Sequence, residues 1–231
     1  MTIPSIEEML KAGMHFGHRT SKWHPKCAPF IFGERNDVHI IDLIKSRELL
    51  EIAMNFIKKF SEEGKTILFV ATKVQAKKPI RNVAEANGMP YVSEKWMGGT
   101  ITNFSIIKKM IKKYTDLLKD KSSGKLEKYT KKERLEFDRE IKRLETKVGG
   151  LTNLEKLPDA IFIWDIKMEK TAITEARKKN IPVIGVCDTN ANPTGINYVI
   201  PANDDATKTI KLIANLIDET IKEGKKGIDK K

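Results

Sequence analysis

The sequence predicts an α/β protein: a doubly wound parallel sheet with an inserted antiparallel coiled-coil hairpin. Short, uninterrupted apolar runs alternate with amphipathic helical segments through most of the 231 residues. Such runs indicate parallel strands covered by helices on both faces, and right-handed crossovers then give an open sheet. A chain of this length can bury a sizeable core. Only residues 104–153 lack any strand signal, so we expect an insertion there.

The chain begins with a predicted short helix, because Ser5 and Glu8 have the spacing of a capping box and Gly13 can end the helix. The run VHII that follows, Val38–Ile41, predicts a buried strand. Asp42 can then cap a long helix, which Gly64 ends.

The same strand–helix unit recurs in residues 66–92. The run TILFVA at 66–71 predicts a strand, and Thr72 with Gln75 has the spacing of a second capping box. The helix that follows should end before Gly88, and a short strand is expected at Tyr91 and Val92.

The last third of the chain repeats this alternation. Three short apolar runs predict strands at 160–164, 182–186 and 198–200. Helices are expected at 168–179 and 204–222, the second with an isoleucine-rich face. In such a sheet, functional loops are expected beyond the carboxyl ends of the strands.

The insertion, residues 104–153, has apolar residues spaced by four, three and four on each of two helical runs. This spacing predicts an a/d seam and an antiparallel coiled coil. The seam consists of Ile107, Ile111, Tyr114 and Leu118 on one helix and Phe137, Ile141, Leu144 and Val148 on the other. Thr130 and Glu133 have capping-box spacing at the start of the second helix.

These patterns divide the chain into three parts. Residues 1–103 and 154–221 should form the sheet domain, with an N-terminal loop at 13–37, and residues 104–153 should form the coiled-coil insertion. Residues 222–231 are expected to be a basic, flexible tail.

The net charge of +12 indicates a polyanionic partner, with nucleic acid ahead of an anionic membrane surface. The insertion has 15 basic and 8 acidic residues, so it carries most of this excess. Two cysteines, Cys27 and Cys187, lie far apart in the sequence and give no reason to propose a disulfide. With no signal-peptide pattern and no long apolar run, we expect a soluble, cytoplasmic protein without a membrane partner.

Motifs for catalysis are missing: the sequence has no phosphate-binding P-loop, GxGxxG or GxSxG pattern. Two weaker signals for an ion remain. His15, His18, His24 and Cys27 could close a zinc site, although the spacing is short for one. Asp188, with Asp204 and Asp205, could hold Mg²⁺, but turn formation and helix N-terminal charge are the simpler explanations.

Features typical of nucleic-acid binding are denser. The N-terminal loop mixes cations with aromatic rings, which can meet phosphates and stack on unpaired bases. We expect Phe30 and Phe32 to cover the loop's own sheet instead. The candidate contacts in and near this loop are Arg19, Lys22, Trp23, His24, Lys26 and Arg35.

The insertion offers a second candidate surface, because its lysines form a strip on the first helix and crowd the tip. A charged face on a coiled coil is often only solvated, but the surplus charge favours phosphate contact. The candidates are Lys108, Lys109, Lys112, Lys113, Lys119, Lys121, Lys125 and Lys128.

Four groups of motifs follow one another along the chain: HFGH with W-x-P-K, RN followed by HIIDL, GGT-x-TN and IPxxDD. In these motifs and their order, from Ile6 to about Ile221, the chain resembles the bacterial small-subunit ribosomal protein two family. The resemblance implies a flavodoxin-like domain with a protruding coiled coil, and a structural role in the small subunit. It also implies contact with ribosomal RNA and help in docking ribosomal protein one.

The motifs of the family place several residues of this chain. Lys22, Trp23 and Lys26 surround or belong to W-x-P-K, Asn103 closes GGT-x-TN at the root of the insertion, and Lys95 lies just before that motif. The family commonly has Met where this chain has Cys27, which argues against the four-ligand zinc site. His15 and His18 could still hold Zn²⁺ or Mg²⁺ with Asp188 or Asp205, but no cofactor is expected.

Two hypotheses follow. The first is a non-enzymatic, ribosome-associated protein that binds ribosomal RNA and neighbouring ribosomal proteins. The second is a flavodoxin-like enzyme or ligand-binding module that uses Asp188, Asp204 and Asp205 at the strand ends. The first accounts for more of the residues.

Overall fold

The structure is a computed structural model that describes residues 2–226. Its centre is a parallel sheet of five strands in the order β5-β4-β6-β7-β8, so the predicted parallel sheet is confirmed. Numbered along the chain, this order is 2-1-3-4-5, one of the two common orders of doubly wound sheets. The strands are β4 (Ile67–Val70), β5 (Tyr91–Val92), β6 (Ala160–Ile163), β7 (Val183–Cys187) and β8 (Tyr198–Pro201).

Both faces of this sheet are covered, which explains why its strands are uninterrupted apolar runs. Along β4, Ile67 and Phe69 face one hydrophobic cluster while Leu68 and Val70 face the other, as the two-residue period of a strand requires. The first cluster contains residues of α2 (Leu43–Glu62), α3 (Val74–Ala86) and α7 (Thr207–Lys226). The second contains residues of α6 (Lys170–Lys178), α4 (Phe104–Ser122) and α5 (Lys131–Val148).

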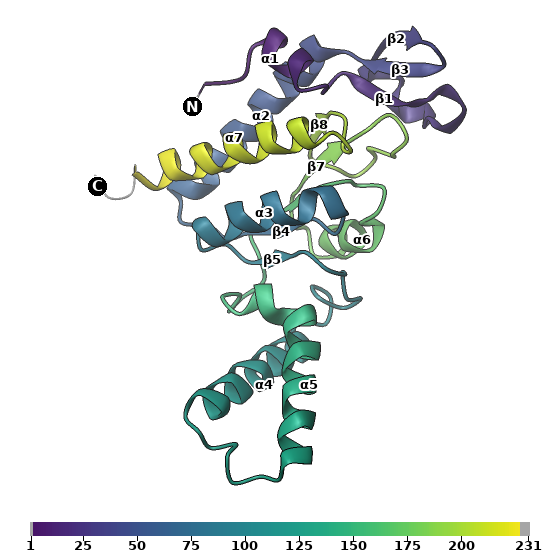
Figure 1. Ribbon diagram of the computed structural model, residues 1–231. Coiled ribbons are helices and arrows are strands. Elements are labelled where there is room, and N and C mark those ends of the chain that lie inside the picture. The colour runs from purple at the N-terminus through teal and green to yellow at the C-terminus, as the bar shows by residue number, and fades with distance from the viewer. Residues whose placement is uncertain (1, 227–231) are drawn as a thin grey trace.

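The N-terminal segment differs from the prediction of a loop at 13–37. It forms a second, antiparallel sheet in the order β1-β3-β2, at the upper right in Figure 1. The strands are β1 (Phe16–Arg19), β2 (Ile31–Arg35) and β3 (Val38–Ile41), joined by the 3-10 turns η1 (Thr20–Lys22) and η2 (Pro25–Phe30). The predicted strand at Val38–Ile41 exists, but it is half-buried in this small sheet.

The turn between β2 and β3 explains why this segment is a hairpin. Asn36 and Asp37 both have positive φ angles, 52° and 60°. Two left-handed residues between antiparallel strands are the geometry of a type I′ turn, which Asn and Asp tolerate better than most residues.

Helix starts follow the predicted caps with one exception. The capping boxes at Ser5 of α1 (Ile6–Lys11) and Thr130 of α5 are confirmed, and the Asp42 side chain accepts from two amides at the start of α2. The box predicted at Thr72 and Gln75 is wrong. Helix α3 starts after Lys73 with no side-chain cap, because the Thr72 hydroxyl donates to Glu169 instead.

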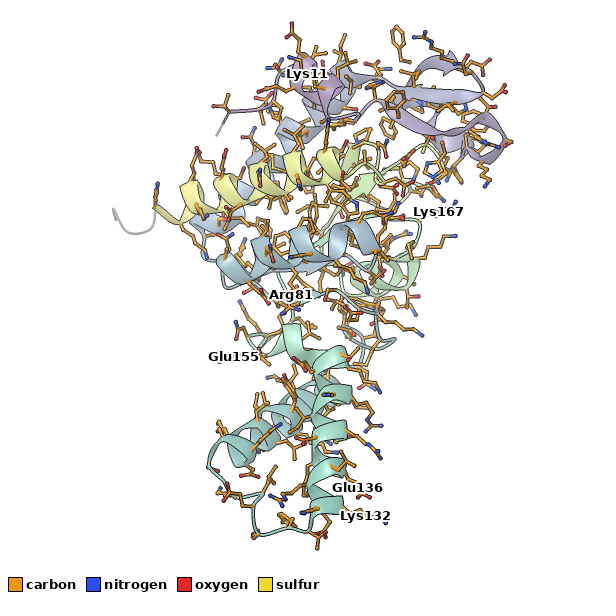
Figure 2. All side chains as sticks on the ribbon, in the orientation of Figure 1. Lys11, Arg81, Lys132, Glu136, Glu155 and Lys167 are labelled. Atoms are coloured by element: carbon orange, nitrogen blue, oxygen red, sulfur yellow. The ribbon has the colours of Figure 1, made fainter. Side chains whose placement is uncertain are left out.

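The insertion consists of helices α4 and α5, which project from the sheet domain, with Lys132 and Glu136 near the far end (Figures 1 and 2). The two helices pack together at the base, where the seam residues are buried. The predicted seam weakens outward: Leu118 is 38% exposed and Phe137 is half-buried against the Tyr129 ring.

The start of the predicted tail is also different. Residues 222–226 continue α7, and Gly224 is buried against α2, so the helix is longer than the sequence indicated. Residues 227–231 lie outside the described part of the chain. Among residues 2–226, the structure has no helix with the length and apolar character needed to cross a bilayer.

Gly150 joins the insertion to the sheet at a point with no room for a side chain. It lies in the 3-10 turn η3 (Gly149–Leu151), where a Cβ would stand 2.7 Å from the Tyr91 ring and closer still to the Tyr91 carbonyl oxygen. We expect Gly150→Ala to lower the free energy of unfolding by about 2 kcal/mol, because backbone must move to relieve the overlap. Urea denaturation measures this.

Gly98 provides the control for this substitution. It lies in the same region, yet a Cβ there would meet no atom within 4 Å. Gly98→Ala should therefore leave stability nearly unchanged. Equal effects of the two substitutions would contradict the steric explanation.

Candidate functional site

The predicted contacts of the N-terminal segment gather around η1, η2 and the ends of β1 and β2. Trp23 is 40% exposed, and its ring lies 5.2 Å from that of His39. The His24 Nδ1 accepts from the Lys26 amide at 3.2 Å, and the Lys26 ammonium donates to Thr194. The cations Arg19, Lys22, Lys26 and Arg35 are exposed.

Phe30 and Phe32 do not behave alike. Phe30 packs against the second hydrophobic cluster, as predicted, but Phe32 is 78% exposed, so the prediction for Phe32 is wrong. In β2, alternate side chains point to opposite faces of a small sheet, and Phe32 is on the solvent side. The segment therefore presents two exposed rings, Trp23 and Phe32, among cations.

This small sheet is held at the carboxyl end of β7 by Thr189. The amides of His18 and His24 donate to the Thr189 hydroxyl and carbonyl oxygens at 2.9 and 2.8 Å. Gly17 lies so close that a Cβ would stand 2.6 Å from the Thr189 methyl group. The exposed rings and cations are thus carried by a platform fixed to the main sheet.

Carboxylates gather at the carboxyl ends of the parallel strands, where a doubly wound sheet would bind a ligand. Asp165 follows β6, Asp188 follows β7, and Asp204 and Asp205 follow β8. The ammonium of Lys73, just after β4, lies 2.6 Å from Asp204, 2.7 Å from Asp205 and 3.5 Å from Asp165. An internal cation therefore lies among the carboxylates that follow β6 and β8.

Burial sets the ionisation of this cluster. Burial, with the neighbouring charges of Asp165 and Asp188, raises the pKa of Asp204 to about 7, although the Lys73 ammonium opposes the rise. Burial disfavours the charged form of Lys73, but its carboxylate partners outweigh this and raise its pKa. Lys73 is thus charged at neutral pH.

The proposed ion ligands are only partly brought together. His18 Nδ1 lies 3.1 Å from Asp188 Oδ1, and its Nε2 lies 3.6 Å from Asp205 Oδ2. The close contact with the Asp188 carboxylate raises the pKa of His18, against the effect of burial. Ligand atoms of His18, Asp188 and Asp204 lie within 4.8 Å of one another. The Lys73 ammonium and, when protonated, the His18 ring offset part of the negative charge of the four carboxylates in this cluster.

The alternative zinc set is not assembled. Cys27 is buried with its Sγ 2.9 Å from the Ala191 carbonyl oxygen and 3.8 Å from Cys187 Sγ. His24 is engaged by the Lys26 amide, and the His15 ring contacts Phe16. The four side chains therefore have separate surroundings.

The buried carboxylate of Glu175 fixes the root of the insertion, a role that the sequence did not predict. Glu175 of α6 is buried, and its carboxylate accepts five hydrogen bonds of 2.8–3.1 Å. The donors are the Trp96 indole, the amides of Gly99, Ile101 and Thr102, and the Thr102 hydroxyl. The WMGGTIT loop is thereby fastened to α6.

The hydrogen bonds keep Glu175 charged in this buried position. Burial raises its pKa, but the bonds from Thr102, Trp96, Gly99 and Ile101 outweigh burial and hold the pKa below its usual value. Asn103 and Lys95, on either side of this fastened loop, are exposed. The loop thus presents both predicted contacts from a fixed backbone.

The eight candidate lysines of the insertion fall into three groups. Lys113 and Lys121 pair with Glu140 and Asp138 across the two helices, each at 2.7 Å, and Lys125 pairs with Asp120. Lys108 and Lys128 lie over aromatic rings. In the described part of the chain no ion pair engages the remaining candidates, which are Lys109, Lys112 and Lys119.

Lys109 and Lys112 also line a shallow depression of about 370 Å³ on α4, together with Asp116 and Leu117. Because Lys113 and Lys121 join α4 to α5, we assign them mainly to the stability of the hairpin. The cations without an ion-pair partner are the ones available to an external anion.

The chain is similar to known proteins over nearly its whole length. A family model described as Ribosomal protein S2 matches residues 9–224. The chain is 47% identical over 227 residues to the small ribosomal subunit protein uS2 of Coprothermobacter proteolyticus, covering 98% of this chain and 85% of the relative. It is 46% identical over 230 residues to the protein of the same name from Fusobacterium nucleatum, covering 99% and 93%.

Proposed function

Because the chain belongs to the ribosomal protein S2 family, whose members are structural, non-enzymatic proteins of the small ribosomal subunit, we propose that it binds ribosomal RNA through two surfaces. The first is the insertion formed by α4 and α5. The second, called the N-terminal platform here, is the small sheet with η1 and η2. We place the protein on cytoplasmic ribosomes.

The observation that carries this proposal is the projecting, basic insertion. It extends away from the sheet domain and holds 15 of the chain's 43 basic residues, but only 8 of its 31 acidic ones (Figure 1). A protruding helical pair with excess positive charge gains affinity by releasing counterions from a phosphate backbone. We assign it as an antiparallel coiled-coil arm, supported by the buried base of its seam.

The N-terminal platform supports a different kind of contact. Trp23 and Phe32 are exposed rings, and the neighbouring cations can meet phosphates while the rings stack on unpaired bases or on a protein partner. We further propose that the two surfaces together support subunit assembly and the docking of ribosomal protein one. The strand order supports assignment of the sheet domain to the flavodoxin-like class.

The contribution of the arm can be tested with its cations that lack an ion-pair partner. We expect Lys109→Gln, Lys112→Gln and Lys119→Gln, combined in the full chain, to weaken binding to small-subunit ribosomal RNA about tenfold or more. The slope of log K against log salt concentration should fall by about 2 to 3, because each lost phosphate contact removes roughly one released counterion. Filter binding across a salt series measures both quantities.

A charge-matched control separates specific placement from total charge. Lys59, Lys208 and Lys211 are exposed on α2 and α7, on the opposite side of the sheet from the arm's packing cluster. Replacing these three by Gln removes the same charge and should change the salt slope much less. Equal losses in the two triple variants would refute a specific role for the arm.

A further inference from the structure

The two cysteines of the chain are neighbours in space although 160 positions separate them. Cys27, in η2 of the N-terminal platform, and Cys187, the last residue of β7, have their Sγ atoms 3.8 Å apart. Both are free and almost fully buried, with exposures of 1% and 2%. The contact therefore joins the platform to the main sheet.

The surroundings of the two sulfurs suit thiols that act on each other. Cys27 Sγ lies 2.9 Å from the Ala191 carbonyl oxygen, and Cys187 Sγ lies 3.4 Å from that of Asp188. A hydrogen bond from Cys187 lowers the pKa of Cys27, and the same bond, with burial, raises that of Cys187. Cys27 belongs to the docked segment rather than to the central sheet, so local opening of that segment exposes it, and it is the expected nucleophile.

We propose that Cys27 and Cys187 form an intrachain disulfide when the protein meets a small-molecule disulfide. A bond between sulfurs requires their approach to about 2.05 Å, which side-chain rotation must supply from the 3.8 Å contact. No other cysteine in the sequence competes. The product would be a covalent link between the N-terminal platform and β7.

The reaction is a pair of thiol–disulfide exchanges. The Cys27 thiolate attacks the oxidant disulfide, forms a mixed disulfide and expels one small thiolate. Cys187 then loses its proton and attacks the Cys27 sulfur, which breaks the mixed disulfide and expels the second small thiolate. The two cysteines lose two electrons and two protons, and the oxidant is reduced to two thiols.

Burial determines when this exchange can happen. The oxidant reaches Cys27 only when the platform lifts from β7, which breaks the hydrogen bonds of His18 and His24 with Thr189. Oxidation is therefore slow and follows local opening rather than simple surface exposure. Once formed, the link closes a loop of about 160 residues, which restricts the unfolded chain strongly.

The test uses the full chain incubated with oxidised glutathione under native conditions, then digested without reduction for mass spectrometry. We expect a peptide pair joined through Cys27 and Cys187, and a midpoint of thermal unfolding raised by about 5–10 °C. Dithiothreitol should reverse both changes. Cys187→Ser should stop at a glutathione adduct on Cys27.

Several results would overturn the proposal: glutathione adducts on both cysteines without a link, a link only between two chains, or thiols that stay reduced throughout the incubation. A link that lowers the unfolding midpoint would also contradict it, because the native geometry would then not favour the bond. The result for the wild-type chain is enough to support or overturn the disulfide proposal. The test therefore does not depend on whether the Cys187→Ser variant folds.

Discussion

Replacing Glu175 by alanine is expected to lower the free energy of unfolding by about 3–5 kcal/mol, the cost of removing one partner from a buried charged network. The substitution leaves the Trp96 indole, three loop amides and the Thr102 hydroxyl without their acceptor. Each abandoned buried donor costs about 1–3 kcal/mol unless water reaches it, and several of these donors are partly buried. Urea denaturation measures the loss.

Glu85→Ala is the matched control for this substitution. Glu85 is also a helical glutamate with two side-chain partners, Arg81 and Tyr91, but it is 45% exposed. Exposed pairs contribute little, so this substitution should cost less than about 1 kcal/mol. If the two variants were equally stable, the loop would not depend on the buried carboxylate.

Glu175→Ala should also weaken RNA binding by more than instability explains, because the loop that leads into α4 would no longer be fixed to α6. Binding is to be compared at a temperature where both variants are fully folded by circular dichroism. Unchanged affinity under those conditions would limit Glu175 to a role in stability.

Replacing Lys73 by methionine is the second change with a large expected effect. Methionine keeps most of the side-chain volume but removes the ammonium from between Asp165, Asp204 and Asp205. At pH 8.5 we expect a loss of about 3–5 kcal/mol, because Lys73 and Asp204 are 13% and 2% exposed and the carboxylates would remain uncompensated.

The loss of unfolding free energy caused by Lys73→Met should be smaller at pH 5.5. The direction of this pH dependence follows from the ionisation of Asp204. Its pKa is raised to about 7, so in the folded protein it is mainly neutral at pH 5.5 and has little attraction for Lys73. A raised pKa means that folding favours the protonated form, so stability falls as pH rises from about 4 to 7. Without Lys73 the fall should continue to higher pH.

Urea denaturation at the two pH values measures this difference. Lys77→Met is the matched control, because Lys77 lies in the first turn of α3, just after Lys73, and pairs with Glu94, which is 48% exposed. It should cost less than about 1 kcal/mol at either pH. Adding Asp204→Asn to Lys73→Met should restore part of the stability at pH 8.5. A loss that does not vary with pH would argue against this assignment.

The elements predicted correctly are those whose determinants are local. The capping boxes at Ser5 and Thr130 join residues three positions apart, and buried strands such as Ile67–Val70 are apolar on both faces. The capping box predicted at Thr72 does not form, because the Thr72 hydroxyl donates to Glu169, 97 positions away. The antiparallel sheet was missed because Asn36 and Asp37, a usable turn signal, lie between strands with weak alternation.

In the candidate site too, the sequence predicted the features that do not depend on contacts between distant residues. Exposed cations could be predicted from charge excess, but the sequence could not separate Lys109 and Lys112 from Lys113, whose partner lies on the other helix. Glu175 looks like an ordinary helical glutamate, since every donor to it comes from a loop more than 70 positions earlier. The Cys27–Cys187 contact was likewise invisible because only the fold brings the two together.

The attachment of the N-terminal platform affects the order in which parts of the chain can fold during translation. The platform and the segment just before it are held by residues that are synthesised much later: Thr189 binds His24, Asn203 binds Met14, and Thr209 binds Ala12. At about 5–20 residues per second, the platform emerges roughly 10–30 s before these partners exist. A segment that is translated early can therefore reach its native position only after partners far along the chain have been made.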